Sequence, residues 1–302
     1  MTVHDSNGMN GVIVINKPAG LTSHDVVNRV RRISGEKSVG HLGTLDPMAT
    51  GVLPLVAGRM TRLAQFYTTS NKCYEGEIRF GFSTDTYDAE GEPSSDSCSV
   101  NLSLDEIRKA AKFFVGRIEQ MPPPFSAKKI QGVPAYKLAR KNRDVELKAV
   151  EVEVREFEIT TFEGDRARFT SDVSSGTYIR SLAHDLGRKL GCGAHLSALC
   201  RTRSGEFGLE DAITLEALEQ AAADETFASL LVHPRRLLPN FPCVTADEEN
   251  VARISNGRSV NLPDMSKAKL VKVFAGQSDL IAIASRVAGT LFHPKVVLMH
   301  LQ

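Results

Sequence analysis

Residues 40–51, GHLGTLDPMATG, combine three glycines with an aspartate, Asp46, that directly precedes a proline. Pro47 disfavours the α region for Asp46, and the glycines allow other backbone to approach closely. The segment therefore predicts a fixed, irregular loop that presents a carboxylate. By itself, this pattern is better explained by an Asp-Pro turn with a structural role than by catalysis.

Strand and helix patterns surround this loop. Gly11–Asn16 is a short apolar run typical of a buried strand, and Thr22 or Ser23 can cap a helix that ends near Gly35. Further strand or helix periodicity occurs at 52–57, 61–67, 74–82, 103–114, 150–162, 166–173 and 178–190. Because hairpin-like neighbouring strands occur beside strand-helix pairs, we expect an α+β fold with a mixed, largely antiparallel central sheet flanked by helices.

The chain of 302 residues exceeds the usual size of one compact domain. Pro234, Pro239 and Pro242 cluster after a helical pattern at 215–231, and we place a domain boundary there. The expected parts are a disordered tail at 1–10, a large domain at 11–238 and a small β-rich domain at 244–302 with strands at 270–274, 280–284 and 296–299.

The composition is that of an ordinary globular protein, with 42% hydrophobic and 24% charged residues. There is no run of about 18 apolar residues and no N-terminal basic segment followed by an apolar one, so we expect a cytoplasmic protein without a membrane partner. The five cysteines form an odd, scattered set without a C-x-x-C pair, and Cys192, His195 and Cys200 match no standard zinc spacing. We expect neither a disulfide framework nor a metal site.

Gly35 and Gly40 have the G-x4-G spacing of a phosphate-binding P-loop. His41 and Leu42 follow where Lys and Ser or Thr are required, and no Rossmann glycine fingerprint occurs. The sequence therefore argues against a nucleotide cofactor.

Charge is unevenly distributed, although the net charge is only +1. Residues 88–100 are acidic and rich in Ser, Gly and Pro, which predicts a mobile surface loop. Residues 128–148 hold seven basic side chains against two acidic ones, which fits a solvated helix face or a phosphate-binding surface.

Arg180 lies in the first turn of a predicted helix, where the helix dipole disfavours a cation, so an anionic partner is suggested. A buried bidentate pair with Asp46 would keep that carboxylate ionised at neutral pH.

Six short blocks stand out in the chain: Asn16–Ser23, Gly40–Leu53, Lys72–Tyr74, Pro122–Lys129, Gly176–Arg180 and Gly193–Leu196. Together they resemble, in order, the motifs of the TruB family of tRNA pseudouridine synthases, over residues 11 to about 220. Each block alone is a weak signal, but six in order make the resemblance specific.

The resemblance implies a catalytic domain at 11–238 that isomerises uridine 55 in the T-loop of tRNA. Asp46 matches the family's catalytic aspartate, which attacks the uridine at C1′ or at C6. Tyr74 matches a tyrosine that stacks on the flipped base, with proton transfer at C5 as a second candidate role, while Tyr178 and Arg180 match residues that line the pocket. The isomerisation needs no redox step, so no cofactor and no metal are implied.

The resemblance also implies contacts with RNA. His41 matches a residue thought to occupy the space left by the flipped base, and Lys17 matches a motif that supports the catalytic loop. Residues 121–148 match an insertion that folds against the RNA arm, with these basic candidates for phosphate contacts: Lys128, Lys129, Arg140, Lys141 and Arg143. The 244–302 segment resembles a PUA-like RNA-binding module, for which we expect an approach to the acceptor stem. The expected partner is the tRNA T-arm, bound by a monomer without a guide RNA.

Two positions depart from the family pattern. Asn142 replaces a glycine in the insertion, and Cys200 precedes Arg201 where an arginine pair is usual, which puts one RNA or structural contact in doubt. Three other functions remain open: a tRNA-binding or tRNA-folding protein without catalysis, a hydrolase that pairs Asp46 with a second carboxylate, and a guide-RNA-dependent relative. The compact length and the absence of basic tails favour the stand-alone enzyme over the last of these.

Overall fold

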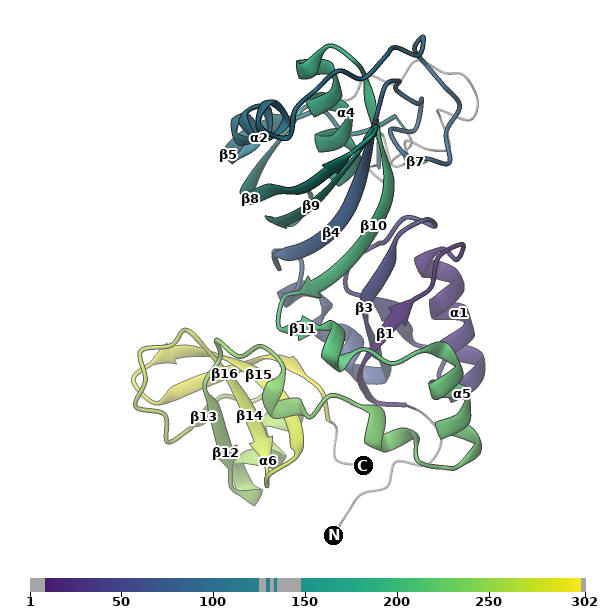
Figure 1. The fold of residues 1–302 in the computed structure, drawn as a ribbon. Coiled ribbons are helices and arrows are strands. Elements are labelled where there is room, and N and C mark those ends of the chain that lie inside the picture. Colours follow the sequence, from purple (N-terminus) through teal and green to yellow (C-terminus); the bar gives the residue numbers. More distant parts are fainter. Residues whose placement is uncertain (1–8, 125–128, 131–132, 135–147, 300–302) are drawn as a thin grey trace.

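The computed structural model describes residues 9–124, 129–130, 133–134 and 148–299. A nine-stranded sheet forms the centre of the fold, in the order β1-β3-β10-β4-β9-β8-β5, with β2 paired to β3 and β11 to β10 (Figure 1). Its strands are β1 (Gly11–Lys17), β2 (Val39–His41), β3 (Thr50–Ala57), β4 (Lys72–Phe80), β5 (Gly116–Gln120), β8 (Val150–Glu163), β9 (Arg166–Val173), β10 (Ala194–Ser204) and β11 (Phe207–Gly208). Within this sheet β3 and β10 pair in parallel and the other pairs are antiparallel, which confirms the predicted mixed, largely antiparallel sheet.

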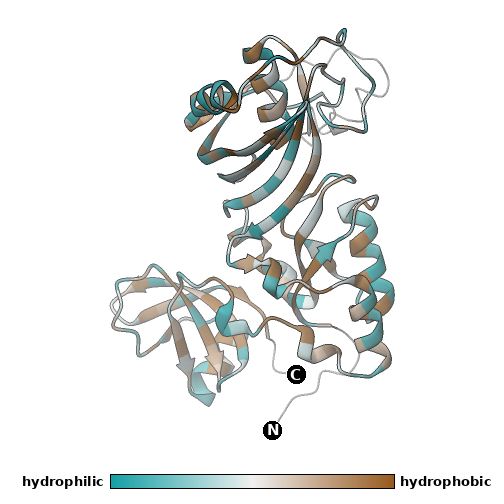
Figure 2. Cartoon of the chain, viewed as in Figure 1, coloured by the Kyte–Doolittle hydropathy of each residue, from teal (hydrophilic) through white to brown (hydrophobic). Residues whose placement is uncertain are grey.

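Four α-helices bury their apolar sides against one face of this sheet: α1 (Ser23–Ser34), α2 (Leu104–Ala111), α4 (Ile179–Leu190) and α5 (Leu215–Ala223). Thr22 caps α1 in a capping box with Asp25, and Gly35 ends the helix at a φ of +69°. In Figure 2, α1 and α5 carry hydrophilic and hydrophobic residues side by side, as expected for helices with one face on a sheet.

The opposite face of β1 and β3 is also covered. Val12 and Val14 of β1 belong to a second core, whereas Ile13 and Ile15 join the core below the helices. This burial on both faces explains the continuous apolar run in the sequence. The covering layer includes the 3₁₀ segment η1 (Gly58–Phe66), the linker after α5, and one side of a second sheet.

The second sheet is C-terminal and five-stranded, in the order β12-β14-β15-β16-β13. Its elements are β12 (Cys243–Ala246), α6 (Glu248–Ser255), β13 (Val260–Asn261), β14 (Leu270–Ala275), β15 (Asp279–Ala288) and β16 (Leu291–Val297). The expected small β-rich C-terminal part is thus confirmed, although its last strand starts at 291 instead of 296. The linker and remaining loops contain short 3₁₀ turns: η2 (Lys112–Phe114), η3 (Leu209–Asp211), η4 (Phe227–Leu230) and η5 (Pro234–Arg236).

Two predicted segments are only partly described. Residues 1–8 of the predicted tail lie outside the described residues, while Met9 is buried in the main core. In the predicted insertion at 121–148, the structure describes an antiparallel pair of short strands, β6 (Lys129–Ile130) and β7 (Val133–Pro134). Lys128, Arg140, Lys141 and Arg143 lie outside the described residues, as does the side chain of Lys129.

Candidate active site

The loop between β2 and β3, residues 42–49, holds Asp46 through a set of side-chain hydrogen bonds to its backbone. The Ser23 hydroxyl accepts from the Leu45 amide at 2.8 Å and donates to the Leu45 carbonyl at 3.0 Å. On the other flank, Arg201 donates to the carbonyls of Gly43 and Thr44 at 3.1 and 3.3 Å. The predicted fixed, irregular loop is therefore present.

Lys17, the last residue of β1, supports the same loop. Its ammonium group is fully buried and donates to the carbonyls of Pro18 and Pro47 at 2.9 and 3.1 Å, as well as to that of Leu21. Burial lowers the pKa of Lys17 to about 8, although Asp46 acts in the opposite direction. The residue thus ties the end of β1 to the position directly after Asp46.

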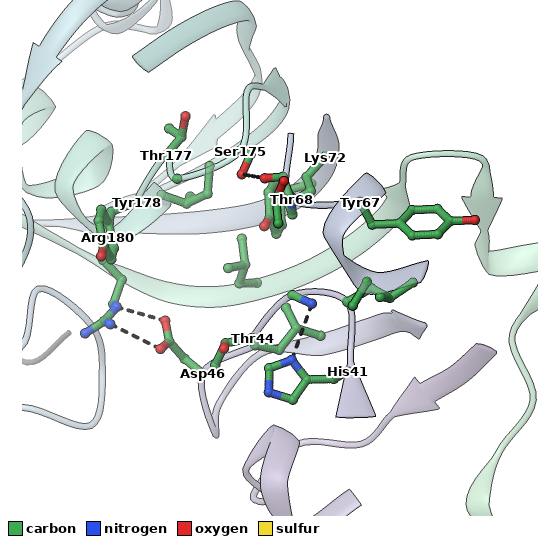
Figure 3. Close-up of a pocket in the computed structure, with 18 residues that line it drawn as sticks. His41, Thr44, Asp46, Tyr67, Thr68, Lys72, Ser175, Thr177, Tyr178 and Arg180 are labelled. Atoms are coloured by element: carbon green, nitrogen blue, oxygen red, sulfur yellow. Dashed lines mark hydrogen bonds and ion pairs between the residues drawn. The ribbon is translucent and has the colours of Figure 1, made fainter. Parts of the chain in front are cut away.

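The carboxylate of Asp46 forms a bidentate pair with Arg180 at the start of α4. Nε of Arg180 lies 2.9 Å from Oδ2 of Asp46, and Nη2 donates to Oδ1 at 3.1 Å (Figure 3). The Arg180 side chain is only 7% exposed, whereas that of Asp46 is 35% exposed, so the carboxylate remains accessible from the cavity. The anionic partner suggested by the placement of Arg180 is therefore Asp46.

A second carboxylate, Asp88, approaches the same guanidinium. Its Oδ2 lies 3.3 Å from Nη1 of Arg180, and its Oδ1 accepts hydrogen bonds from the Thr86 hydroxyl and the Glu90 amide. Asp88 is buried, so the prediction of a surface loop over 88–100 is wrong at its first residue. The acidic, Ser- and Gly-rich composition concealed this role, although the Thr-x-Asp spacing is typical of a turn closed by side-chain hydrogen bonds.

Burial and charge act in opposite directions on Asp46. Burial raises the pKa of its carboxyl, the Arg180 guanidinium lowers it, and the negative charge of Asp88 raises it again. The net direction is upward. The sequence predicted that a pair with Arg180 would keep Asp46 ionised. That prediction gives the effect of Arg180 on the pKa correctly but leaves out the larger, opposite effect of burial.

A cavity of about 560 Å³ opens beside Asp46. Five of the site residues predicted from the sequence line it together: His41, Asp46, Tyr74, Tyr178 and Arg180. Tyr178 occupies the N-cap position of α4 without a side-chain cap. The Gln120 side chain at the end of β5 holds its backbone by donating to the carbonyl at 3.0 Å and accepting from the amide at 2.8 Å. Residues from distant parts of the chain are thus brought together around one cavity.

Tyr74 and His41 differ in how they are held. Tyr74 lies in β4 directly opposite Arg201 of β10 and is 7% exposed, and burial raises the pKa of its hydroxyl. His41 is half-buried, its Nδ1 accepts from the Gly43 amide at 3.3 Å, and burial lowers its pKa. The imidazole is therefore biased toward its neutral form.

Arg201 and Lys72 were not identified as site residues from the sequence. Arg201 is fully buried and donates from Nε to the Val52 carbonyl of β3 at 2.7 Å and from Nη1 and Nη2 to the Thr44 and Gly43 carbonyls, so it ties the loop that carries Asp46 to β3. The arginine that is usual before it in the family is replaced by Cys200, which is half-buried. Lys72 lines the cavity two residues before Tyr74. An arginine flanked by strand residues gives no sequence signal of burial, because such arginines usually lie at the surface.

Within the described residues, no cluster of three or more His, Cys, Asp or Glu side chains could hold a metal ion. The helices described are also too short or too polar to cross a membrane.

Comparisons with known proteins place the chain in one family. Residues 31–179 match the family described as TruB family pseudouridylate synthase (N terminal domain), and residues 180–239 match the tRNA pseudouridylate synthase B C-terminal domain. The chain is 53% identical to tRNA pseudouridine synthase B of Solibacter usitatus over 96% of its own length and 100% of that protein. It is 40% identical to the Bacillus cereus protein of the same name, covering 95% of this chain and 94% of that one.

Solved structures resemble the chain as well. The crystal structure of a Cbf5-Nop10-Gar1 complex contains a chain that aligns with a TM-score of 0.72 at 28% identity, covering 96% of this chain and 85% of that one. The structure of an H/ACA RNP bound to a substrate RNA containing 2′-deoxyuridine aligns with a TM-score of 0.71 at 27% identity, with the same coverage.

Proposed function

The chain belongs to the TruB family of pseudouridylate synthases, and from that premise we propose that it converts uridine 55 in the T-loop of tRNA to pseudouridine. Relatives named tRNA pseudouridine synthase B, aligned over nearly their whole length, support tRNA as the substrate. The observation that carries the proposal is the accessible carboxylate of Asp46, oriented by Arg180 at the edge of a cavity lined by Tyr74 and Tyr178.

Asp46 acts as the nucleophile. Its carboxylate adds to the uridine at C1′ or at C6, and the bond between N1 and C1′ breaks while the base stays in the cavity. The base then rotates, C5 bonds to C1′, the aspartyl bond is released, and C5 loses its proton while N1 gains one. Both routes consume and release the same atoms, so neither oxidant nor reductant is needed.

Arg180 and Asp88 set the orientation of the nucleophile. Both oxygens of Asp46 accept from Arg180, and a carboxylate has lone pairs left over for attack. Asp88 and the Thr86 carbonyl hold the opposite side of the guanidinium, at 3.3 and 3.0 Å. Since the arginine is fixed from two sides, the carboxylate is held in one direction before the substrate binds.

The target base has to leave the folded RNA to reach Asp46. We assign base flipping to this step, with the flipped uracil received in the cavity and stacked on Tyr74. His41 is the last residue of β2 and lines the cavity, and we assign it the role of filling the space in the RNA that the flipped base leaves. Lys17 supports the loop from the buried side.

The RNA arm itself would be held by the basic residues of the 121–148 insertion and by the PUA-like C-terminal module. We expect a monomer to bind the T-arm. The relatives that align over nearly their full length are named for tRNA, which supports binding without a guide RNA. This assignment separates it from the larger assemblies in which its structural neighbours occur.

The test is release of tritium from a T-arm stem-loop labelled at uridine C5. We expect release by the wild-type protein and none by Asp46→Asn, which keeps the shape of the side chain. Asp165→Asn, which alters an exposed carboxylate paired with Arg79, should release tritium like the wild type. If the wild type binds the RNA and releases no tritium, the chain is an RNA-binding protein and the catalytic proposal fails.

A further inference from the structure

Lys72 places a positive charge in the wall of the cavity. It is the first residue of β4, and its side chain points to the same side of the strand as Tyr74 because successive strand residues alternate. Its ammonium group donates to the Ser70 carbonyl at 2.7 Å. Figure 3 shows it on the same cavity as Asp46 and Arg180.

Within the described part of the chain, the ammonium group of Lys72 forms no ion pair with a carboxylate. The ion pairs beside the cavity join Arg180 to Asp46 and to Asp88. Burial, together with repulsion by the Arg201 cation, lowers the pKa of Lys72 to about 8. Lys17, in contrast, is stabilised in its charged form by Asp46. The fold therefore holds a cation at the cavity without supplying the anion that would stabilise it.

The loop that carries Asp46 lies directly beside Lys72. Gly43 has a φ of +145°, and a side chain there would begin 3.4 Å from Cε of Lys72 and 3.5 Å from Nη1 of Arg201. Ser175, whose hydroxyl donates to the Thr68 carbonyl at 2.5 Å, lines the same cavity. Lys72 is therefore placed against the Asp46 loop on the cavity that this loop lines.

Building on the proposed RNA substrate, we propose that Lys72 binds the phosphodiester next to the flipped uridine. Uracil and ribose carry no charge at neutral pH, so the anion that accompanies the nucleotide is its backbone phosphate. Lysine binds phosphate as a point charge and needs no fixed planar geometry, which suits a flexible side chain at the cavity wall. Lys72 is then a substrate-binding residue that fixes the sugar-phosphate while Asp46 acts on the nucleoside.

The first experiment compares the binding of a T-arm stem-loop to the wild type, Lys72→Gln and Lys72→Arg. We expect Lys72→Gln to weaken binding about tenfold, the effect of losing one charge-assisted hydrogen bond. The slope of log Kd against log salt should fall by about 0.7 for the one lost phosphate contact, and Lys72→Arg should retain both values. Lys112→Gln removes the same charge from an exposed position outside the cavity and should change neither.

Replacing one backbone phosphate of the RNA by an uncharged methylphosphonate identifies which phosphate Lys72 contacts. Stem-loops carrying a methylphosphonate on the 5′ or the 3′ side of the target uridine are bound to the wild type and to Lys72→Gln. At one of the two linkages the wild type should lose about tenfold in affinity and Lys72→Gln should lose nothing further. Equal losses in both proteins at both linkages would overturn the inference.

Activity separates this inference from the proposed function. At saturating RNA, Lys72→Gln should release tritium with nearly the wild-type kcat and a raised KM, because the contact exists before and during the reaction. Failure of the wild type to release tritium would refute the proposed function, whereas an unchanged Kd and KM in Lys72→Gln would refute only the role of Lys72. If Lys72→Gln does not fold, the methylphosphonate comparison is made with Lys72→Arg, which must show the same loss at the same linkage as the wild type.

Discussion

Replacing Arg180 by methionine removes the cation that two carboxylates share. Asp46 and Asp88 lie 2.9 and 3.3 Å from the guanidinium, and the side chain of Asp88 is only 4% exposed. Breaking a fully buried pair costs about 3–5 kcal/mol. Because water reaches Asp46, we expect Arg180→Met to lower the free energy of unfolding at pH 7 by about 2–4 kcal/mol.

The pH dependence of this loss follows from the pKa of Asp46. Arg180 lowers that pKa, so its removal raises a value that burial already holds above the ordinary 3.8. The folded variant then binds a proton more readily than the unfolded chain, and its stability falls as the pH rises from the ordinary value through the raised one. The deficit relative to the wild type should therefore be larger at pH 7 than at pH 4, and the acid limb of kcat should move to higher pH.

Urea unfolding followed by circular dichroism at both pH values measures the first effect, and tritium release across pH measures the second. Arg188→Met is the matched control, because Arg188 lies in the same helix, is 71% exposed and contacts Asp185 at 3.7 Å. We expect it to change stability by less than about 0.5 kcal/mol. A deficit for Arg180→Met that is the same at pH 4 and pH 7, with an unshifted kcat profile, would refute the reasoning.

Three other substitutions, at Gly51, Lys272 and Lys17, test buried supports of the fold, and Gly164→Ala serves as the comparison for Gly51→Ala. Gly51→Ala should lower the free energy of unfolding by about 2–4 kcal/mol, since φ is +97° and the added methyl would lie 2.3 Å from the Arg201 carbonyl oxygen. Gly164→Ala, at φ +62° in open space, should cost only about 1 kcal/mol in the same urea titration. Lys272→Met should cost about 1–3 kcal/mol and speed proteolysis of the linker, because the buried ammonium donates to two linker carbonyls at 2.8 and 2.6 Å. Burial lowers the pKa of Lys17 to about 8 from 10.5, so the wild type should gain stability as the pH rises between these values, and Lys17→Met should lack that gain in unfolding titrations at pH 8 and pH 10.

Local elements could be predicted from the sequence because their signals are local. The apolar run of β1 and the cap and terminal glycine of α1 give both elements nearly their observed bounds. The order of the strands has no such local signal. In the parallel pair of β3 and β10, Arg201 lies opposite Gly51, and its side chain donates to the Val52 carbonyl, 149 positions away in the sequence. No periodicity within either strand encodes that partner.

The same distinction applies to the site. Asp46 and Arg180 were identified through motifs that surround them, but Asp88 and Arg201 act through contacts that exist only after the chain has folded. Asp88 lies in a segment whose composition is typical of a surface loop, and its burial depends on pairing with Leu196 of β10. Arg201 is buried because its guanidinium satisfies carbonyls of a loop far away in sequence. The burial of Asp88 and Arg201 therefore depends on partners distant in the sequence, which the composition of their own segments does not reveal.

The C-terminal sheet takes part in shaping the cavity even though it contributes no lining residue. Tyr67 belongs to the cavity lining, and its hydroxyl donates at 2.7 Å to Glu206, which also accepts from the Leu238 amide of the linker at 2.8 Å. Behind it, η1 packs between the cavity and a core that includes Phe274 and Ile283 of the C-terminal sheet. One wall of the cavity is therefore supported by the linker and by the second sheet. Because protein interiors are closely packed, we expect a shift of this sheet to be transmitted through η1 to the cavity wall at Tyr67.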